Sequence, residues 1–120
     1  MTIKGKTIGF LGAGNMGEAM IKGLLKAGLV SPHAIFATDV RPERLREVEK
    51  LYGIQVLEDN AELVRRSDVV ILAVKPQVIA EVLKEVGPVL TPKNLVISIA
   101  AGVSTAALRS HLAGRDVRLI

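Results

Sequence analysis

Three glycines near the start of the chain are the residues whose type and spacing most clearly point to chemistry. Gly12, Gly14 and Gly17 follow the apolar run 7–11 at the G-x-G-x-x-G spacing, and a segment with helical periodicity comes after them. In a dinucleotide site the first glycine makes the tight turn, the second lets a pyrophosphate approach the backbone, and the third lets the helix pack on the strand. The free amide groups and the dipole of the helix then face the phosphates. The alternative interpretation is an ordinary strand-to-helix turn that binds nothing.

An acidic and a basic residue follow the second predicted strand. Asp39 lies where a carboxylate accepts hydrogen bonds from the adenosine ribose hydroxyls and repels a 2′-phosphate. Arg41 could attract that phosphate, or it could pair with Asp39 or point into solvent. Because both signs of charge are present, we expect both NAD(H) and NADP(H) to bind.

The composition restricts the class of protein. The 120 residues suffice for one domain, 1–120, and with 49% apolar but only 2% aromatic residues its core must be aliphatic, which suits a parallel sheet covered on both faces. The net charge of +4 comes from scattered basic residues, so we expect no nucleic-acid partner. There is no cysteine, no metal-ligand cluster and no apolar run long enough for a membrane helix. We therefore expect a soluble, cytoplasmic protein without a membrane or metal partner.

Apolar runs and helical segments alternate along the chain, which indicates βαβ units. The pattern predicts strands over residues 7–11, 34–38, 54–56, 69–74, 95–99 and 117–120, and helices over 15–27, 42–51, 61–66, from after Pro76 to about 86, and 104–112. We therefore predict an α/β fold, a single Rossmann-type domain with a doubly wound parallel sheet in the order 3-2-1-4-5-6. Within the second helix, Leu45 and Val48 should face inward. The charged residues of that helix should form a solvated face: Glu43, Arg44, Arg46, Glu47 and Lys50.

The predicted strand order places three segments around one crevice, because the order reverses between the first and fourth strands. They are the glycine turn, the segment Ala73 to Pro76, and the segment Ala100 to Gly102. Small residues in the last two would let a flat ring lie close to the backbone, although they would equally suit tight helix–sheet packing. We expect Lys75 to contact a cofactor mainly through its backbone. No catalytic residue can be assigned.

Several segments resemble one enzyme family. Gly9 to Gly17, Gly-Phe-Leu-Gly-Ala-Gly-Asn-Met-Gly, is similar to nicotinamide-dependent reductases and β-hydroxyacid dehydrogenases. Ala-Val-Lys-Pro at 73–76 and Ser-Ile-Ala-Ala-Gly-Val at 98–103 narrow the resemblance to the pyrroline-5-carboxylate reductases, and it covers the whole chain as their N-terminal domain. This resemblance implies reduction of a cyclic imine acid, pyrroline-5-carboxylate, to proline by hydride from NAD(P)H, with the protein mainly positioning the substrate.

The resemblance also implies roles for individual residues. The pyrophosphate would lie on Leu11, Gly12, Ala13, Gly14, Asn15, Met16 and Gly17. Asn60 would reach the adenosine side. The nicotinamide ribose would contact Ala73, Val74, Lys75 and Pro76, and the nicotinamide face would contact Ala100, Ala101 and Gly102. The family's helical domain, which binds substrate and makes the homo-oligomer, would begin just beyond Ile120, so a chain that ends in an apolar strand is expected to be a fragment.

Two other functions remain open at this point. One is a different dehydrogenase of the β-hydroxyacid type, against which the Ala-Val-Lys-Pro segment argues. The other is a nucleotide-sensing module without enzyme activity. The family often has a small or hydroxyl residue where this chain has Asp39, which leaves the choice between NAD and NADP open. The resemblance favours NADPH and Asp39 favours NADH, so we expect NADH to be unusually well tolerated.

Overall fold

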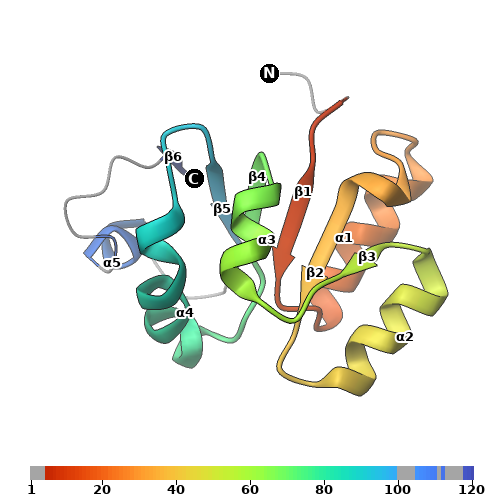
Figure 1. Cartoon of the computed structure of the whole chain (residues 1–120), viewed down its shortest axis with the longest axis horizontal. Helices are drawn as coiled ribbons and strands as arrows, with labels where there is room; N and C mark the ends of the chain where they lie inside the picture. Colours follow the sequence, from red (N-terminus) through yellow and green to blue (C-terminus); the bar gives the residue numbers. More distant parts are fainter. Residues whose placement is uncertain (1–4, 100–104, 111, 113–117) are drawn as a thin grey trace.

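Strands and helices alternate along the chain, as the sequence pattern predicts. A computed structural model describes residues 5–99, 105–110, 112 and 118–120 (Figure 1). The strands are β1 (Ile8–Leu11), β2 (Ile35–Thr38), β3 (Gln55–Val56), β4 (Val69–Leu72), β5 (Leu95–Ser98) and β6 (Arg118–Leu119). The α-helices are α1 (Asn15–Lys26), α2 (Pro42–Tyr52), α3 (Asn60–Arg66), α4 (Ile79–Val86) and α5 (Thr105–Ser110). Three short 3-10 helices, η1 (Pro32–Ala34), η2 (Pro76–Val78) and η3 (Gly87–Val89), lie between them.

The strands form one parallel sheet in the order β3-β2-β1-β4-β5-β6. The predicted doubly wound order is therefore confirmed. β1 lies at the centre, where Ile8 is opposite Ile35 of β2 on one side and Val69 of β4 on the other. The order reverses between β1 and β4, so the carboxyl ends of these two strands form the edge at which doubly wound folds bind ligands.

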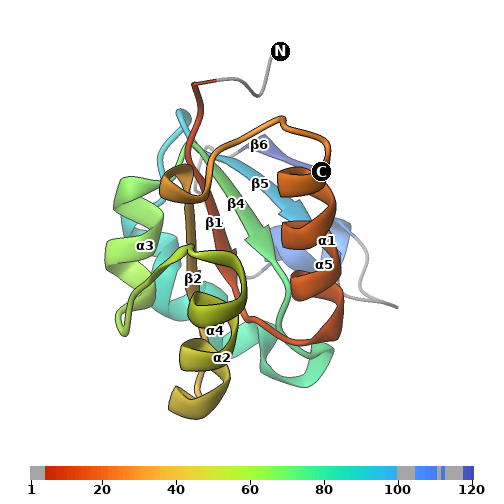
Figure 2. The same cartoon turned by 90° about the vertical axis from the view of Figure 1, so that its right-hand side faces the viewer.

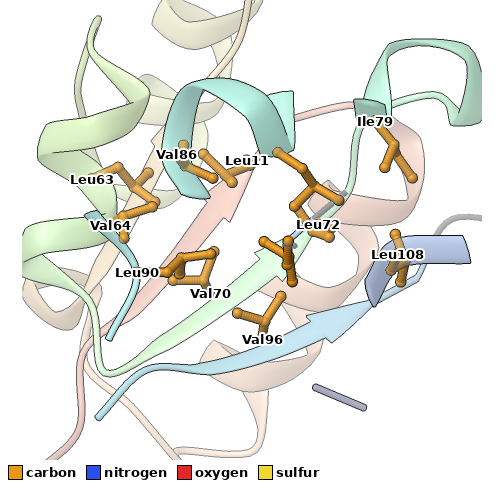
Figure 3. Packing of buried hydrophobic residues seen from close by; sticks show 12 residues of the cluster. Leu11, Leu63, Val64, Val70, Leu72, Ile79, Val86, Leu90, Val96 and Leu108 are labelled. Atoms are coloured by element: carbon orange, nitrogen blue, oxygen red, sulfur yellow. The ribbon is translucent and has the colours of Figure 1, made fainter. Parts of the chain in front are cut away.

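Helices cover both faces of the sheet, and each face has its own apolar core. In Figure 2, α1 and α3 lie on opposite sides of the sheet. The β4 side chains alternate between the two cores, because Val70 and Leu72 face α3, α4 and α5 while Val69 and Ile71 face α1 and α2. Figure 3 shows the first of these cores. Its members are aliphatic, as the composition predicts: Leu11, Leu63, Val64, Val70, Leu72, Ile79, Leu83, Val86, Leu90, Val96, Leu108 and Leu112.

Local sequence signals fix the ends of two helices. Proline occupies the first position of α2, where its missing N–H costs no hydrogen bond, and Gly53 ends the helix with a φ of 70°. Asp59 caps α3 by accepting a hydrogen bond from the Ala61 amide at 3.0 Å. The inward positions predicted for α2, Leu45 and Val48, are buried.

Some predicted boundaries differ from the structure. The segment at Pro32 predicted as a loop forms a 3-10 turn, and β4 ends at Leu72, before Ala73 and Val74. The helix after Lys75 begins as the 3-10 turn η2, in which Pro76 is the first residue, and α4 follows from Ile79. None of the helices in the described part of the chain is long and apolar enough to cross a membrane. The cap predicted at Ser104 and the first residue predicted for the last strand, Val117, lie outside the described residues.

Gly9, in the middle of β1, allows α3 to approach the sheet closely. A Cβ atom built on Gly9 would lie 2.2 Å from Ser67 Oγ and 2.4 Å from Leu63 Cδ2. Both neighbours are buried, and the Ser67 hydroxyl donates to the Leu63 carbonyl at 2.6 Å. A methyl group at Gly9 would therefore have to displace well-packed atoms.

We predict that Gly9→Ala lowers the free energy of unfolding by about 1–3 kcal/mol, the usual cost of overpacking a core. The matched control is Gly23→Ala in α1, where an added Cβ would meet no atom within 4 Å. That change should raise the free energy of unfolding by about 0.5–1 kcal/mol, because alanine favours the helix. Urea unfolding of both variants measures the difference, and an unchanged Gly9→Ala midpoint would contradict the close approach.

Candidate functional site

A groove of about 1210 Å³ runs along the carboxyl ends of β1, β2 and β4. Its wall includes eight of the residues predicted to bind a cofactor: Gly12, Gly14, Asp39, Arg41, Asn60, Ala73, Val74 and Lys75. Leu11, Ala13, Asn15, Met16, Gly17 and Pro76 are absent from the wall, and of these Leu11, Ala13 and Gly17 are buried behind it. The predictions for Ala100, Ala101 and Gly102 fall outside the described residues.

The three glycines differ in their surroundings. Gly12 has a φ of 101°, and a Cβ there would lie 2.8 Å from the backbone of Ala73, so the turn out of β1 requires glycine. Gly17 lies against the same turn, since its Cβ would come 3.0 Å from the Gly12 carbonyl oxygen. A Cβ on Gly14 would meet no atom within 4 Å. The turn is therefore close-packed at its first and third glycines and open at its second.

The first turn of α1 offers unpaired backbone donors beside this open space. Glu18 N donates to Gly14 O at 2.9 Å, which is the first hydrogen bond of the helix. The amide groups before Glu18 therefore have no acceptor one turn back within the helix. Asn15 and Met16 are exposed at this end. Open space, free N–H groups and the positive end of the dipole suit an anion.

The Asp39 carboxylate turns inward, toward the glycine turn. Its Oδ2 accepts from Ala13 N at 2.8 Å, and its Oδ1 accepts from Arg41 N at 2.9 Å. The Arg41 guanidinium also pairs with both oxygens, at 3.0 and 3.2 Å, which is one of the roles the sequence left open for it. Burial alone would raise the pKa of Asp39, but the hydrogen bonds from Arg41 and from the two amide groups hold it below its usual value.

Asn60 is held in place by β2. Thr38, which is buried at the end of that strand, donates its hydroxyl to Asn60 Oδ1 at 2.5 Å. The bond uses the carbonyl oxygen of the Asn60 side chain, so its NH₂ group is the part that can donate to a ligand in the groove.

The other end of the groove is formed by the backbone that follows β4. Ala73 N donates to Leu11 O at 2.8 Å, which ties this segment to the end of β1. The Lys75 side chain is exposed, and Lys75 O accepts from Val78 N at 3.0 Å as η2 begins. Among the described residues, no group of three or more histidine, aspartate or glutamate side chains could hold a metal ion.

The prediction that all charged residues of α2 lie in solvent is wrong for Arg44. Its side chain is only 14% exposed, and it contacts the glycine turn from the side of α2. Nε donates to Ala13 O at 2.5 Å, Nη2 donates to Glu18 Oε1 at 2.5 Å, and Nη1 donates to Glu47. The Tyr52 hydroxyl donates to the other oxygen of Glu18 at 2.5 Å. These bonds, from Tyr52 and then Arg44, lower the pKa of Glu18.

Comparison with known proteins agrees with this geometry. Residues 7–102 match the family described as NADP oxidoreductase, coenzyme F420-dependent. A pyrroline-5-carboxylate reductase of Methanosarcina acetivorans is 48% identical over 92% of this chain. The match covers 41% of that relative, so this chain spans about two-fifths of its length.

Solved structures similar to this chain also include pyrroline-5-carboxylate reductases. A pyrroline-5-carboxylate reductase from Coxiella burnetii superposes with a TM-score of 0.84 at 34% identity, over 91% of this chain and 40% of that one. The Plasmodium falciparum pyrroline carboxylate reductase, solved with NADP bound, gives 0.81 at 26% identity, over 95% and 41%. The chain belongs to the family of coenzyme F420-dependent NADP oxidoreductases.

Proposed function

We propose that the chain is the cofactor-binding portion of an enzyme that reduces 1-pyrroline-5-carboxylate to L-proline with NADPH or NADH. The open space at Gly14 beside the first turn of α1 carries this proposal, because it is the shape and polarity that a pyrophosphate requires. The pyrroline-5-carboxylate reductases similar to this chain support the choice of substrate. A cytoplasmic location and a homo-oligomer made by a further helical domain belong to the same proposal.

We expect the cofactor to lie in an extended pose along the groove. Leu11 to Gly17 would hold the pyrophosphate, with Asn60 and Asp39 toward the adenosine. The backbone of Ala73 to Pro76 would support the nicotinamide ribose, and Ala100 to Gly102 would lie under the nicotinamide face. When bound, the cofactor supplies the hydride. The protonated C=N bond of the substrate is already electrophilic, so the groove contributes mainly position.

The two alternative functions predict different outcomes in binding and turnover assays. A β-hydroxyacid dehydrogenase would oxidise a hydroxyl-bearing substrate with NAD(P)⁺, and a sensing module would bind the dinucleotide without turnover in any longer protein. For the 120-residue chain alone, we expect binding of NADPH or NADH without turnover of pyrroline-5-carboxylate, because more than half of each compared relative lies outside the match. Calorimetry and an NAD(P)H oxidation assay test this, and full-rate oxidation by the chain alone would contradict it.

Gly14→Val should abolish dinucleotide binding and leave the fold intact. The branched side chain would extend into the open space beside Gly14, where its Cβ has no neighbour within 4 Å, and would occupy the place proposed for the pyrophosphate. Gly17→Val should instead lower stability, because its Cβ would press on the Gly12 carbonyl. Isothermal titration with NADPH and thermal unfolding separate the two effects. Wild-type affinity in Gly14→Val would show that the loop is only a turn.

The Asp39–Arg41 pair should set the preference between the two cofactors. Replacing Asp39 by serine removes the charge that opposes a 2′-phosphate and frees the Arg41 guanidinium to bind it. We expect Asp39→Ser to change the difference between the NADPH and NADH binding free energies by about 1–2 kcal/mol in favour of NADPH. This is the scale of one charged hydrogen bond. Arg41→Ala should weaken NADPH selectively.

The ratio of NADPH to NADH affinity is the informative quantity, since loss of the Asp39–Ala13 bond would weaken both cofactors alike. Parallel titrations of wild type and Asp39→Ser with NADPH and NADH provide it. An unchanged ratio would mean that Asp39 does not act on the ribose side.

A further inference from the structure

Ala13, between the first two glycines of the turn, is held at both its backbone groups by charged side chains. Its N–H donates to Asp39 at 2.8 Å, and its carbonyl accepts from Arg44 Nε at 2.5 Å. Its methyl group is fully buried. Both charged residues come from the segment that contains the end of β2 and the start of α2. The position of the glycine turn therefore depends on a neighbouring βα unit as well as on its own strand and helix.

The contact with Arg44 fixes the direction of the next amide. The described chain has no cis peptide bond, so the Ala13 carbonyl and the Gly14 N–H point in opposite directions within one rigid peptide plane. Because Arg44 holds the carbonyl toward α2, the Gly14 N–H is directed away from α2. A free carbonyl could rotate together with its peptide plane and change the direction of this donor.

Arg44 also neutralises a carboxylate that would oppose an anion. Glu18 lies in the first turn of α1, one turn from the open space at Gly14. Arg44 and the Tyr52 hydroxyl together occupy both of its oxygens. With Arg44 removed, Glu18 and Glu47 would each lose their guanidinium partner, and unpaired negative charge would remain beside the phosphate site.

We propose that Arg44 is a positioning residue for the pyrophosphate of the bound dinucleotide, acting through the Ala13 carbonyl and the Glu18 carboxylate. It touches no part of the ligand. This inference rests on the proposed function, since it requires that a dinucleotide occupies the groove. It gives a role in binding to a residue whose sequence position, on the charged side of α2, indicates only a solvated charge.

The test compares a ligand that has a pyrophosphate with one that has none. Titrations of NADP⁺ and of adenosine into the 120-residue chain, followed by the amide resonances in ¹H–¹⁵N spectra, give a dissociation constant for each. We expect Arg44→Met to weaken NADP⁺ binding about tenfold or more, as for the loss of a charge-assisted hydrogen bond, and to leave adenosine binding unchanged. The Gly14 amide resonance should move on NADP⁺ binding in the wild type and move less in the variant.

Two further variants complete the set. Lys50→Met removes the same charge from an exposed position of α2 outside the groove wall, and it should change neither dissociation constant. Arg44→Lys keeps the charge but lacks the planar fork, so it should bind NADP⁺ with an affinity between those of wild type and Arg44→Met. Arg44→Lys also serves if Arg44→Met fails to fold.

The failures are distinguishable. Wild-type protein that binds neither NADP⁺ nor NAD⁺ would overturn the proposed function. Wild-type protein that binds NADP⁺, with an unchanged dissociation constant in both Arg44 variants, would overturn only the role of Arg44. An equal loss of NADP⁺ and adenosine affinity would also overturn it, because a general disturbance of the fold affects both ligands.

Discussion

The close contact between the ends of β1 and β4 is the constraint on which the site depends. Ala73 N bonds to Leu11 O, and the Gly12 turn lies so near Ala73 that a side chain at Gly12 would collide with its backbone. This contact joins the two halves of the doubly wound sheet at the point where their order reverses. The glycine turn after β1 and the segment after β4, which both line the groove, are thus parts of one rigid junction.

Charge at the site is arranged in pairs. Asp39 pairs with Arg41, and Arg44 bridges Glu18 and Glu47, so each of these carboxylates has a guanidinium partner. These ion pairs supply no net positive charge, so at the glycine turn itself the groups that suit a phosphate are the backbone amides and the α1 dipole. Such groups are fixed in direction by the helix, whereas a flexible lysine or arginine would supply charge without direction.

The sequence sufficed for the fold and for the parts of the site that follow from local patterns. Apolar runs located the strands, and the glycine spacing located the turn, because each depends on residues close together in the chain. Arg44 could not be found in this way. Its partners Ala13 and Glu18 belong to another βα unit, and on a helix with several charges nothing distinguishes the one that folds inward. The inward turn of the Asp39 carboxylate, likewise, depends on the Ala13 amide, which follows the neighbouring strand β1.

The hydrogen bonds around the glycine turn have a consequence for the thermodynamics of binding. Gly12 N is held by Thr38 O, and Ala13 is held by Asp39 and Arg44, so the protein's own groups fix the shape of the turn. Ordering a loop on binding costs conformational entropy, which is subtracted from the affinity. A turn that is ordered during folding loses this conformational entropy then, and loses little more when a ligand binds. The pyrophosphate would therefore enter a preorganised cradle, and its affinity is linked to the stability of the fold.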